Sequence, residues 1–91
     1  MNKELTIDKP ADSIVSENVS RLILHNDEFN SFIWVISSLC EVLKIDSPQA
    51  EQLAMLAHHK GKVSIKSGNH DDLKPFKDAL NERGIETTIE T

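Results

Sequence analysis

Three consecutive side chains with oxygen acceptors interrupt the apolar pattern in the segment "LILHNDEFNSF". The apolar run stops there and gives way to Asn26, Asp27 and Glu28 before two phenylalanines follow. Such a triplet either turns the chain, because Asn and Asp side chains accept hydrogen bonds from their own backbone, or presents acceptors to a ligand. On its own, the triplet favours the turn.

Two adjacent histidines, His58 and His59, end an alanine-rich segment. Neighbouring residues on a helix diverge by about 100°, so the pair cannot ligate one metal ion from one face. Four residues before His58 stands Ala54, which is no ligand. A favourable interaction with the helix dipole accounts for His59. His58 shares the Ala54 side of the helix and is the better candidate for a function, and we expect no metal.

Catalytic arrangements are weakly supported. Cys40 lies in the middle of an apolar helical pattern, where a cysteine is more often a small core residue than a nucleophile. Asp27 and His58 are a conceivable general-base dyad, but the sequence offers no nucleophile or oxyanion hole beside them. We therefore expect a binding protein without catalytic residues or cofactors.

Six elements would position these residues. Short β-branched or alternating runs predict strands at 19–26, 62–67 and 85–91, and periodic apolar residues predict helices at 31–44, 46–61 and in the segment 68–84. The order β-α-α-β-α-β indicates an α+β fold, a two-layer sandwich with a three-stranded antiparallel sheet. Residues 1–18 show neither period and predict a flexible N-terminal extension before a domain at 19–91.

The first helix would be capped by Asn30 or Ser31. Its apolar residues lie on more than one side, at Ile33, Trp34 and Val35 as well as on the Phe32–Ile36–Leu39–Leu43 face, which predicts a sandwiched helix.

The second helix would have Ser47 as its cap and Pro48 at its first position. Gly61 would follow its end, and its apolar stripe contains Ala50, Leu53, Ala54 and Ala57. Three alanines in that stripe indicate that another element packs closely.

The third helix would begin near Asp71 or Asp72. With Asp72 as the cap, Pro75 falls in the first turn, where its missing N–H costs nothing. Leu73, Phe76 and Leu80 would face inward, and Gly84 would end the helix.

The bulk properties restrict the function. A chain of 91 residues forms one domain and buries only about 60–65% of its unfolded surface, which favours a small binding module. The net charge of -5 argues against nucleic acid, whose partners carry clustered Lys and Arg.

No apolar run approaches the roughly 20 residues that span a bilayer, and a single cysteine suits a reducing compartment. We expect a cytoplasmic protein, a monomer without a membrane partner.

The segments "LILHNDEFNSFIWVISSL" and "AEQLAMLAHHKGKV", followed by the closing strand, resemble ClpS, the adaptor of the ATP-dependent Clp protease. The match combines the Asn-Asp-Glu triplet with the ending His-x-x-Gly-Lys, here His58, Gly61 and Lys62, at a fixed separation. Residues 20 to 65 follow the family pattern without a gap.

The resemblance implies an adaptor that binds N-degrons, which are proteins whose first residue is Phe, Leu, Tyr or Trp, and delivers them to a Clp-family AAA+ unfoldase through its N-terminal domain. It implies that Asn26, Asp27 and His58 hold the free α-ammonium. The implied lining of the side-chain pocket is Glu28, Asn30, Phe32, Val35, Ala54, Ala57 and Ile85. The extension at 1–18 would help to engage the unfoldase.

This chain departs from the family pattern in three places. Ala54 and Phe32 stand where family members commonly have methionine, which affects the preference among Leu, Phe, Tyr and Trp. The region 66–72 is shorter, which affects the surface that docks on the unfoldase.

Two other functions fit parts of the sequence. The element order also resembles the C-terminal domain of the ribosomal stalk protein, a non-catalytic interaction module, although the acidic balance lacks the basic helix face expected there. A small hydrolase using Asp27 and His58 ranks below both.

Overall fold

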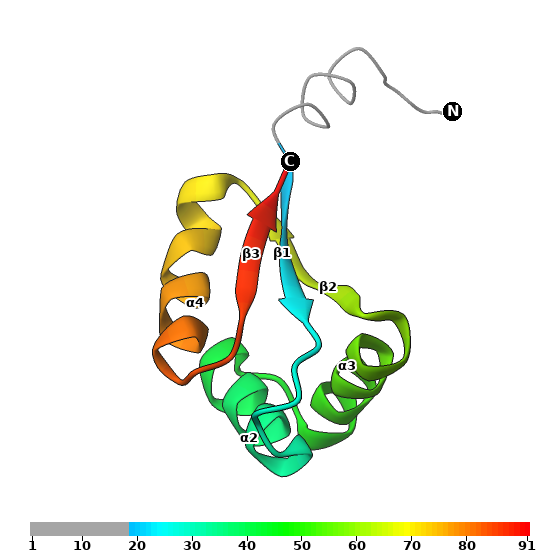
Figure 1. Cartoon of the computed structure of the whole chain (residues 1–91). Coiled ribbons are helices and arrows are strands. Elements are labelled where there is room, and N and C mark those ends of the chain that lie inside the picture. Colours follow the sequence, from blue (N-terminus) through cyan, green and yellow to red (C-terminus); the bar gives the residue numbers. More distant parts are fainter. Residues whose placement is uncertain (1–18) are drawn as a thin grey trace, which may run out of the picture.

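A computed structural model describes residues 19–91, and the N-terminal extension expected at 1–18 lies outside the described residues. The elements are β1 (Ser20–His25), α2 (Phe32–Leu43), α3 (Ser47–Lys60), β2 (Lys62–Gly68), α4 (His70–Glu82) and β3 (Thr87–Glu90). Figure 1 shows their arrangement. The predicted order β-α-α-β-α-β and the three-stranded antiparallel sheet are confirmed.

β1 is the central strand of the sheet, which has the order β2-β1-β3. Leu24 pairs with Val63 on one side and Thr87 on the other, and both neighbouring strands run antiparallel to β1. The register with β2 shifts between Leu22 and Ile23. Leu22 and Leu24 both join the main core and are almost fully buried, so this strand supplies the centre of the sheet's helix-covered face.

The three helices cover the sheet unequally. α4 contacts all three strands, α3 contacts β2, and α2 packs mainly on α3 and α4. In Figure 1, α2 and α3 lie together beyond the end of β1 at which the chain leaves the strand. The core that joins the layers consists of Leu22, Leu24, Leu39, Ala50, Ala57, Leu73, Leu80 and Ile85. The region beyond β1 is therefore bounded by two helices and a loop.

The N-terminus of α2 agrees with the sequence, and that of α3 differs by one residue. Ser31 caps α2, and its hydroxyl accepts a hydrogen bond from Trp34 N at 3.0 Å. Asp46 caps α3 through a 2.9 Å bond from Gln49 N, so the prediction of Ser47 was wrong. Both residue types cap helices, and the neighbouring proline fits anywhere in the first turn, so it does not discriminate between the two.

α4 begins earlier than predicted. Asn69 is its cap and accepts a 2.9 Å hydrogen bond from Asp72 N, so Asp72 lies inside the helix. Pro75 consequently lies within the helix and not in its first turn, where a proline removes one main-chain hydrogen bond. Leu73 and Leu80 are buried as predicted, and Gly84 adopts the positive φ of 83° expected after the helix end.

The expectation that α2 is sandwiched was wrong. Ile33 is 78% exposed and Trp34 is 40% exposed. α2 packs on α3 and α4, and among the described residues nothing covers its Ile33 side. Apolar residues around a helix therefore did not indicate burial here.

Candidate functional site

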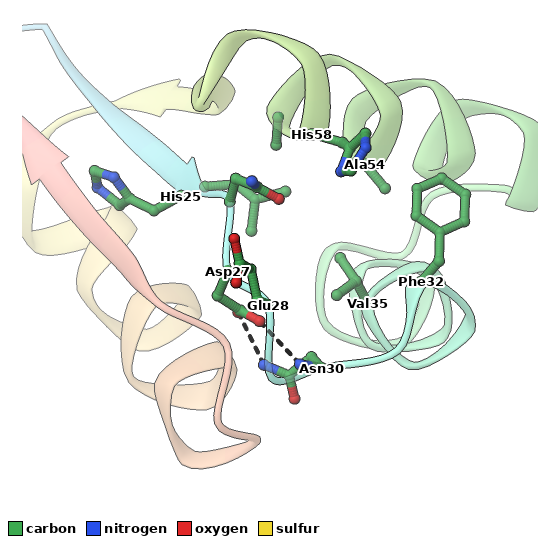
Figure 2. A pocket seen from close by; sticks show the side chains of 11 residues that line it. His25, Asp27, Glu28, Asn30, Phe32, Val35, Ala54 and His58 are labelled. Carbon is green, nitrogen blue, oxygen red and sulfur yellow. Dashed lines mark hydrogen bonds between the residues drawn. The ribbon is translucent and has the colours of Figure 1, made fainter.

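A pocket of about 290 Å³ lies where the end of β1, the start of α2 and the last turns of α3 meet. Figure 2 shows the side chains of the 11 residues that line it, with His58 and Ala54 on α3 across from the loop that follows β1. The lining consists of Leu24, His25, Asn26, Asp27, Glu28, Asn30, Phe32, Val35, Ala54, Ala57 and His58. Acceptor side chains and small apolar side chains thus share one hollow.

The end of β1 is joined directly to the end of α3. The N–H of Asn26 donates a 2.9 Å hydrogen bond to the carbonyl oxygen of Gly61. Gly61 has a φ of 92°, a conformation that suits glycine, and its N–H donates to Ala57 O at 2.8 Å. His58 lies within the turn that this bond closes, which explains why Asn26 and His58 line the same pocket although they are far apart in the sequence.

Asp27 organises the loop between β1 and α2. Its Oδ1 accepts hydrogen bonds from the main-chain N–H groups of Phe29 and Asn30, each at 2.9 Å, and its Oδ2 accepts one from Asn30 Nδ2 at 2.9 Å. Figure 2 shows the two bonds to Asn30. Asp27 therefore forms the turn that the triplet alone predicted. A carboxylate offers about four acceptor positions, so Oδ2 retains one for a ligand.

The pKa of Asp27 lies below its ordinary value. Partial burial raises this pKa, but the hydrogen bonds from Asn30 and Phe29 stabilise the carboxylate and together outweigh the burial. Asp27 is therefore a stable anion, and no described hydrogen bond joins it to His58. The proposed general-base dyad has no geometric support within residues 19–91.

Glu28 is an exposed acid at the same pocket. Its carboxylate accepts no hydrogen bond from any described side chain or main-chain group, in contrast to that of Asp27. Among the described residues that line the pocket, none is Lys or Arg. Two carboxylates and no fixed cation give the pocket a negative field, which favours a positively charged group.

The apolar part of the pocket comes from both helices. Ala54 and Ala57 on α3 are each 4% exposed, and Val35 on α2 is half-buried. Phe32 is 40% exposed and stands at the α2 side of the opening (Figure 2). Small side chains leave the space that larger ones would fill, so a bulky apolar group from a ligand fits between α2 and α3.

The structure changes the predicted lining at three residues. Ile85 does not line the pocket and is instead buried in the core, 1% exposed. Leu24 and His25 line it but were not predicted. The His25 imidazole points toward β3 (Figure 2), with Nε2 2.7 Å from Thr88 Oγ1. The alternation along the strand predicts that Leu24 faces inward. The register shift between Leu22 and Ile23 interrupts this alternation, so the sequence pattern does not indicate which residues of β1 line the pocket.

No group of three or more His, Cys, Asp and Glu side chains with metal-site geometry occurs in the described range. The pocket is lined by two imidazoles, of which His25 is bonded to Thr88, and by two neighbouring carboxylates, a set of acceptors that suits an organic cation.

Comparison with known proteins identifies the chain. Residues 16–88 match the family "ATP-dependent Clp protease adaptor protein ClpS". The chain belongs to the ClpS family. An ATP-dependent Clp protease adapter protein ClpS from Synechococcus elongatus is 28% identical over 71 residues, which cover 77% of this chain and 75% of that protein.

A solved structure shares the ClpS fold. Agrobacterium tumefaciens ClpS2, determined bound to L-phenylalaninamide, matches with a TM-score of 0.70 and 22% identity, covering 80% of this chain and 95% of that one. The fold class predicted from the sequence and the ClpS resemblance are confirmed, and the chain is a member of a family of Clp protease adaptors. No helix described here has the length and apolarity to cross a bilayer.

Proposed function

We propose that this ClpS-family chain binds N-degrons, proteins with a free N-terminal Leu, Phe, Tyr or Trp, and delivers them to a Clp-family AAA+ unfoldase. One observation carries the proposal: Asn26, Asp27, Glu28 and His58 line the same pocket as Val35, Ala54 and Ala57. A free N-terminal residue presents an ammonium and a side chain from the same carbon atom. A pocket with acceptors at one end and an apolar hollow beside them matches that pair of groups.

The ammonium needs acceptors. It has three N–H donors and no acceptor capacity, and removing it from water is unfavourable unless its donors are satisfied. The Asn26 carboxamide oxygen, a neutral His58 nitrogen and a carboxylate supply them. Asp27 retains one acceptor position on Oδ2, and Glu28 adds a second carboxylate at the pocket. Charge-assisted bonds contribute about 1.5–3 kcal/mol each.

The side chain supplies the second part of the affinity. Burying a Leu or Phe side chain between Val35, Ala54 and Ala57 contributes about 1.5–3 kcal/mol. The relative bound to L-phenylalaninamide supports this assignment, because that ligand combines a free amine with a phenylalanine side chain. Neither part alone selects an N-terminus, whereas both together do.

The proposal includes the rest of the adaptor function. The domain at 19–91 binds the degron without catalysing a reaction, as a monomer in the cytoplasm. It requires no cofactor, nucleic acid or membrane. The extension at 1–18 and the N-terminal domain of the unfoldase complete the delivery.

A peptide titration tests the proposal. We expect a Leu-led peptide to bind and its N-acetylated form to lose at least 100-fold in affinity, because acetylation removes the charge and two of the donors. A peptide with Leu moved to the second position and Gly in the first is the matched control and should bind as weakly. Equal binding of the free and acetylated peptides would refute the proposal.

A further inference from the structure

The loop that lines one side of the pocket is tied to a distant turn. Asn30 Nδ2 donates two hydrogen bonds, one to Asp27 Oδ2 at 2.9 Å and one to the carbonyl oxygen of Gly84 at 2.8 Å. Gly84 follows α4 and does not line the pocket. The Asp27 loop is thus hydrogen-bonded to the turn between α4 and β3, which helps to fix its position.

Helix α2, which follows this loop and lines another side of the pocket, is tied to the same turn. Trp34 Nε1 donates a 3.0 Å hydrogen bond to the carbonyl oxygen of Arg83, the residue before Gly84. The Arg83 guanidinium lies over the Trp34 ring, 5.5 Å from its centre, and contacts Glu41 at 3.1 Å and Ser38 Oγ at 3.4 Å. Three positions of α2 therefore contact one arginine.

The turn itself is fixed to the core. Ile85, the next residue, is 1% exposed, and its N–H donates to Leu80 O at 3.1 Å. Gly84 N donates to Asn81 O at 3.0 Å. Two consecutive carbonyl groups, those of Arg83 and Gly84, thus accept one bond from the Asp27 loop and one from α2.

We propose that the Arg83–Gly84 turn holds the Asp27 loop and α2 in position against α3, and so determines which first side chains the pocket accepts. Trp34 and Arg83 are positioning residues. They act through Phe32 and Val35, which line the pocket and lie close to Trp34 on α2. This inference rests on the proposed function. It adds specificity determinants that lie outside the pocket lining.

A role in specificity differs from a role in general stability in the size of its effect on each. Trp34 is 40% exposed and the Arg83 side chain is 25% exposed, so their contacts are partly open to solvent and stabilise the fold only modestly. Discrimination between side chains that differ by one methylene or one branch amounts to about 10–200-fold and depends on how closely the walls approach. A small outward movement of α2 therefore changes selectivity more than it changes the folded fraction.

The test measures affinities of the full chain for Leu- and Ile-led peptides, together with the melting temperature. Trp34→Phe keeps an aromatic ring but removes the indole N–H, and Arg83→Ala keeps the carbonyl but removes the guanidinium. Both should lower the Leu-to-Ile affinity ratio threefold or more, because a released α2 admits the branched side chain. The melting temperature should fall by only a few degrees.

Asn81→Ala is the matched control. The Asn81 side chain accepts 2.9 Å bonds from Thr87 N and Thr87 Oγ1 at the same end of α4, but it contacts neither side of the pocket. It should lower the melting temperature at least as much while leaving the affinity ratio unchanged.

The possible results separate a failure of the proposed function from a failure of the inference about the turn. If the unmodified chain binds no free-amine peptide, the proposed function and the inference both fail. If it binds, but Trp34→Phe and Arg83→Ala leave the ratio as Asn81→Ala does, the turn has only a structural role and the inference alone is overturned.

Discussion

Asn26 N donates a 2.9 Å hydrogen bond to Gly61 O, and this bond joins the first residue after β1 to the end of α3. It places the Asn26 side chain beside the turn that carries His58. The two halves of the sequence pattern, separated by some thirty residues, therefore meet through a main-chain contact and not through their side chains.

Gly61→Ala should weaken both folding and binding. Gly61 has a φ of 92°, and a Cβ there would meet nothing within 4 Å, so the penalty is backbone strain alone. We expect a loss of about 1–2 kcal/mol in the free energy of unfolding, measured by urea denaturation, and a lower affinity for Leu-led peptides. Gly68→Ala is the control, because its Cβ would make an ordinary 3.7 Å contact with Leu73. Equal stability of the two variants would contradict this account.

Glu28→Gln should reduce affinity without reducing stability. The exposed carboxylate accepts no bond from a described group, so the free energy of unfolding should change by less than about 0.5 kcal/mol. Affinity for a free-amine peptide should fall about tenfold at low salt, and by less at high salt because exposed charges are screened. Glu51→Gln on α3 makes the same charge change outside the pocket lining. Calorimetric titration would count against the prediction if both variants bound alike.

Asp27→Asn should destabilise the fold in a pH-dependent manner. Hydrogen bonds from Asn30 and Phe29 hold the pKa of Asp27 below its ordinary value of 3.8. Its stabilising contribution is therefore complete above pH 3.8 and is lost as the pH falls through the lowered folded-state pKa. We expect Asp27→Asn to be less stable by about 1 kcal/mol at pH 7, and the difference to narrow at the acidic end of a series of denaturation curves. A difference that stays constant with pH would exclude the ionised loop as its source.

Ala54→Met should narrow the apolar hollow. Ala54 is 4% exposed and lines the pocket, so a longer side chain there occupies part of the space that a ligand would fill. Affinity for a Trp-led peptide should fall about 10-fold relative to that for a Leu-led peptide, because the larger side chain loses more of its buried apolar surface. The exposed residue Gln52 provides the control Gln52→Met on the same helix. Retained affinity for a Trp-led peptide would place the side-chain site elsewhere.

The fold was predictable because local signals and hydrophobic periodicity agreed along most of the chain. Ser31 was a correct cap, and Gly61 and Gly84 correctly marked helix ends. The errors arose where several capping residues stand together. In "GNHDD" the helix begins at the earliest of them because β2 pairs up to Gly68, so Asn69 is the first residue free to cap. Pro75 then falls inside the helix, a local penalty that the packing of Leu73 and Leu80 outweighs.

The site was predictable in its residue types but not in its boundaries. Asn26, Asp27 and His58, predicted from the family resemblance to hold an amine, line one pocket. Ile85 was misplaced because a buried strand-side residue can face the core or the pocket, and only the tertiary arrangement decides between them. The ties of Trp34 and Asn30 to the α4–β3 turn had no sequence signal, since they use main-chain carbonyl groups that every residue carries.

The central place of β1 has a consequence for the population of active molecules. The amide of His25, bonded to Glu86 O, and the amide of Asn26, bonded to Gly61 O, connect the strand end to both flanking segments. Both bonds lie at the end of β1, so local fraying can open them while the middle of the sheet stays paired. Native-state hydrogen exchange of these two amides should therefore be faster than that of amides in the middle of β1. Molecules with a frayed strand end would bind no ligand although most of the domain remains folded.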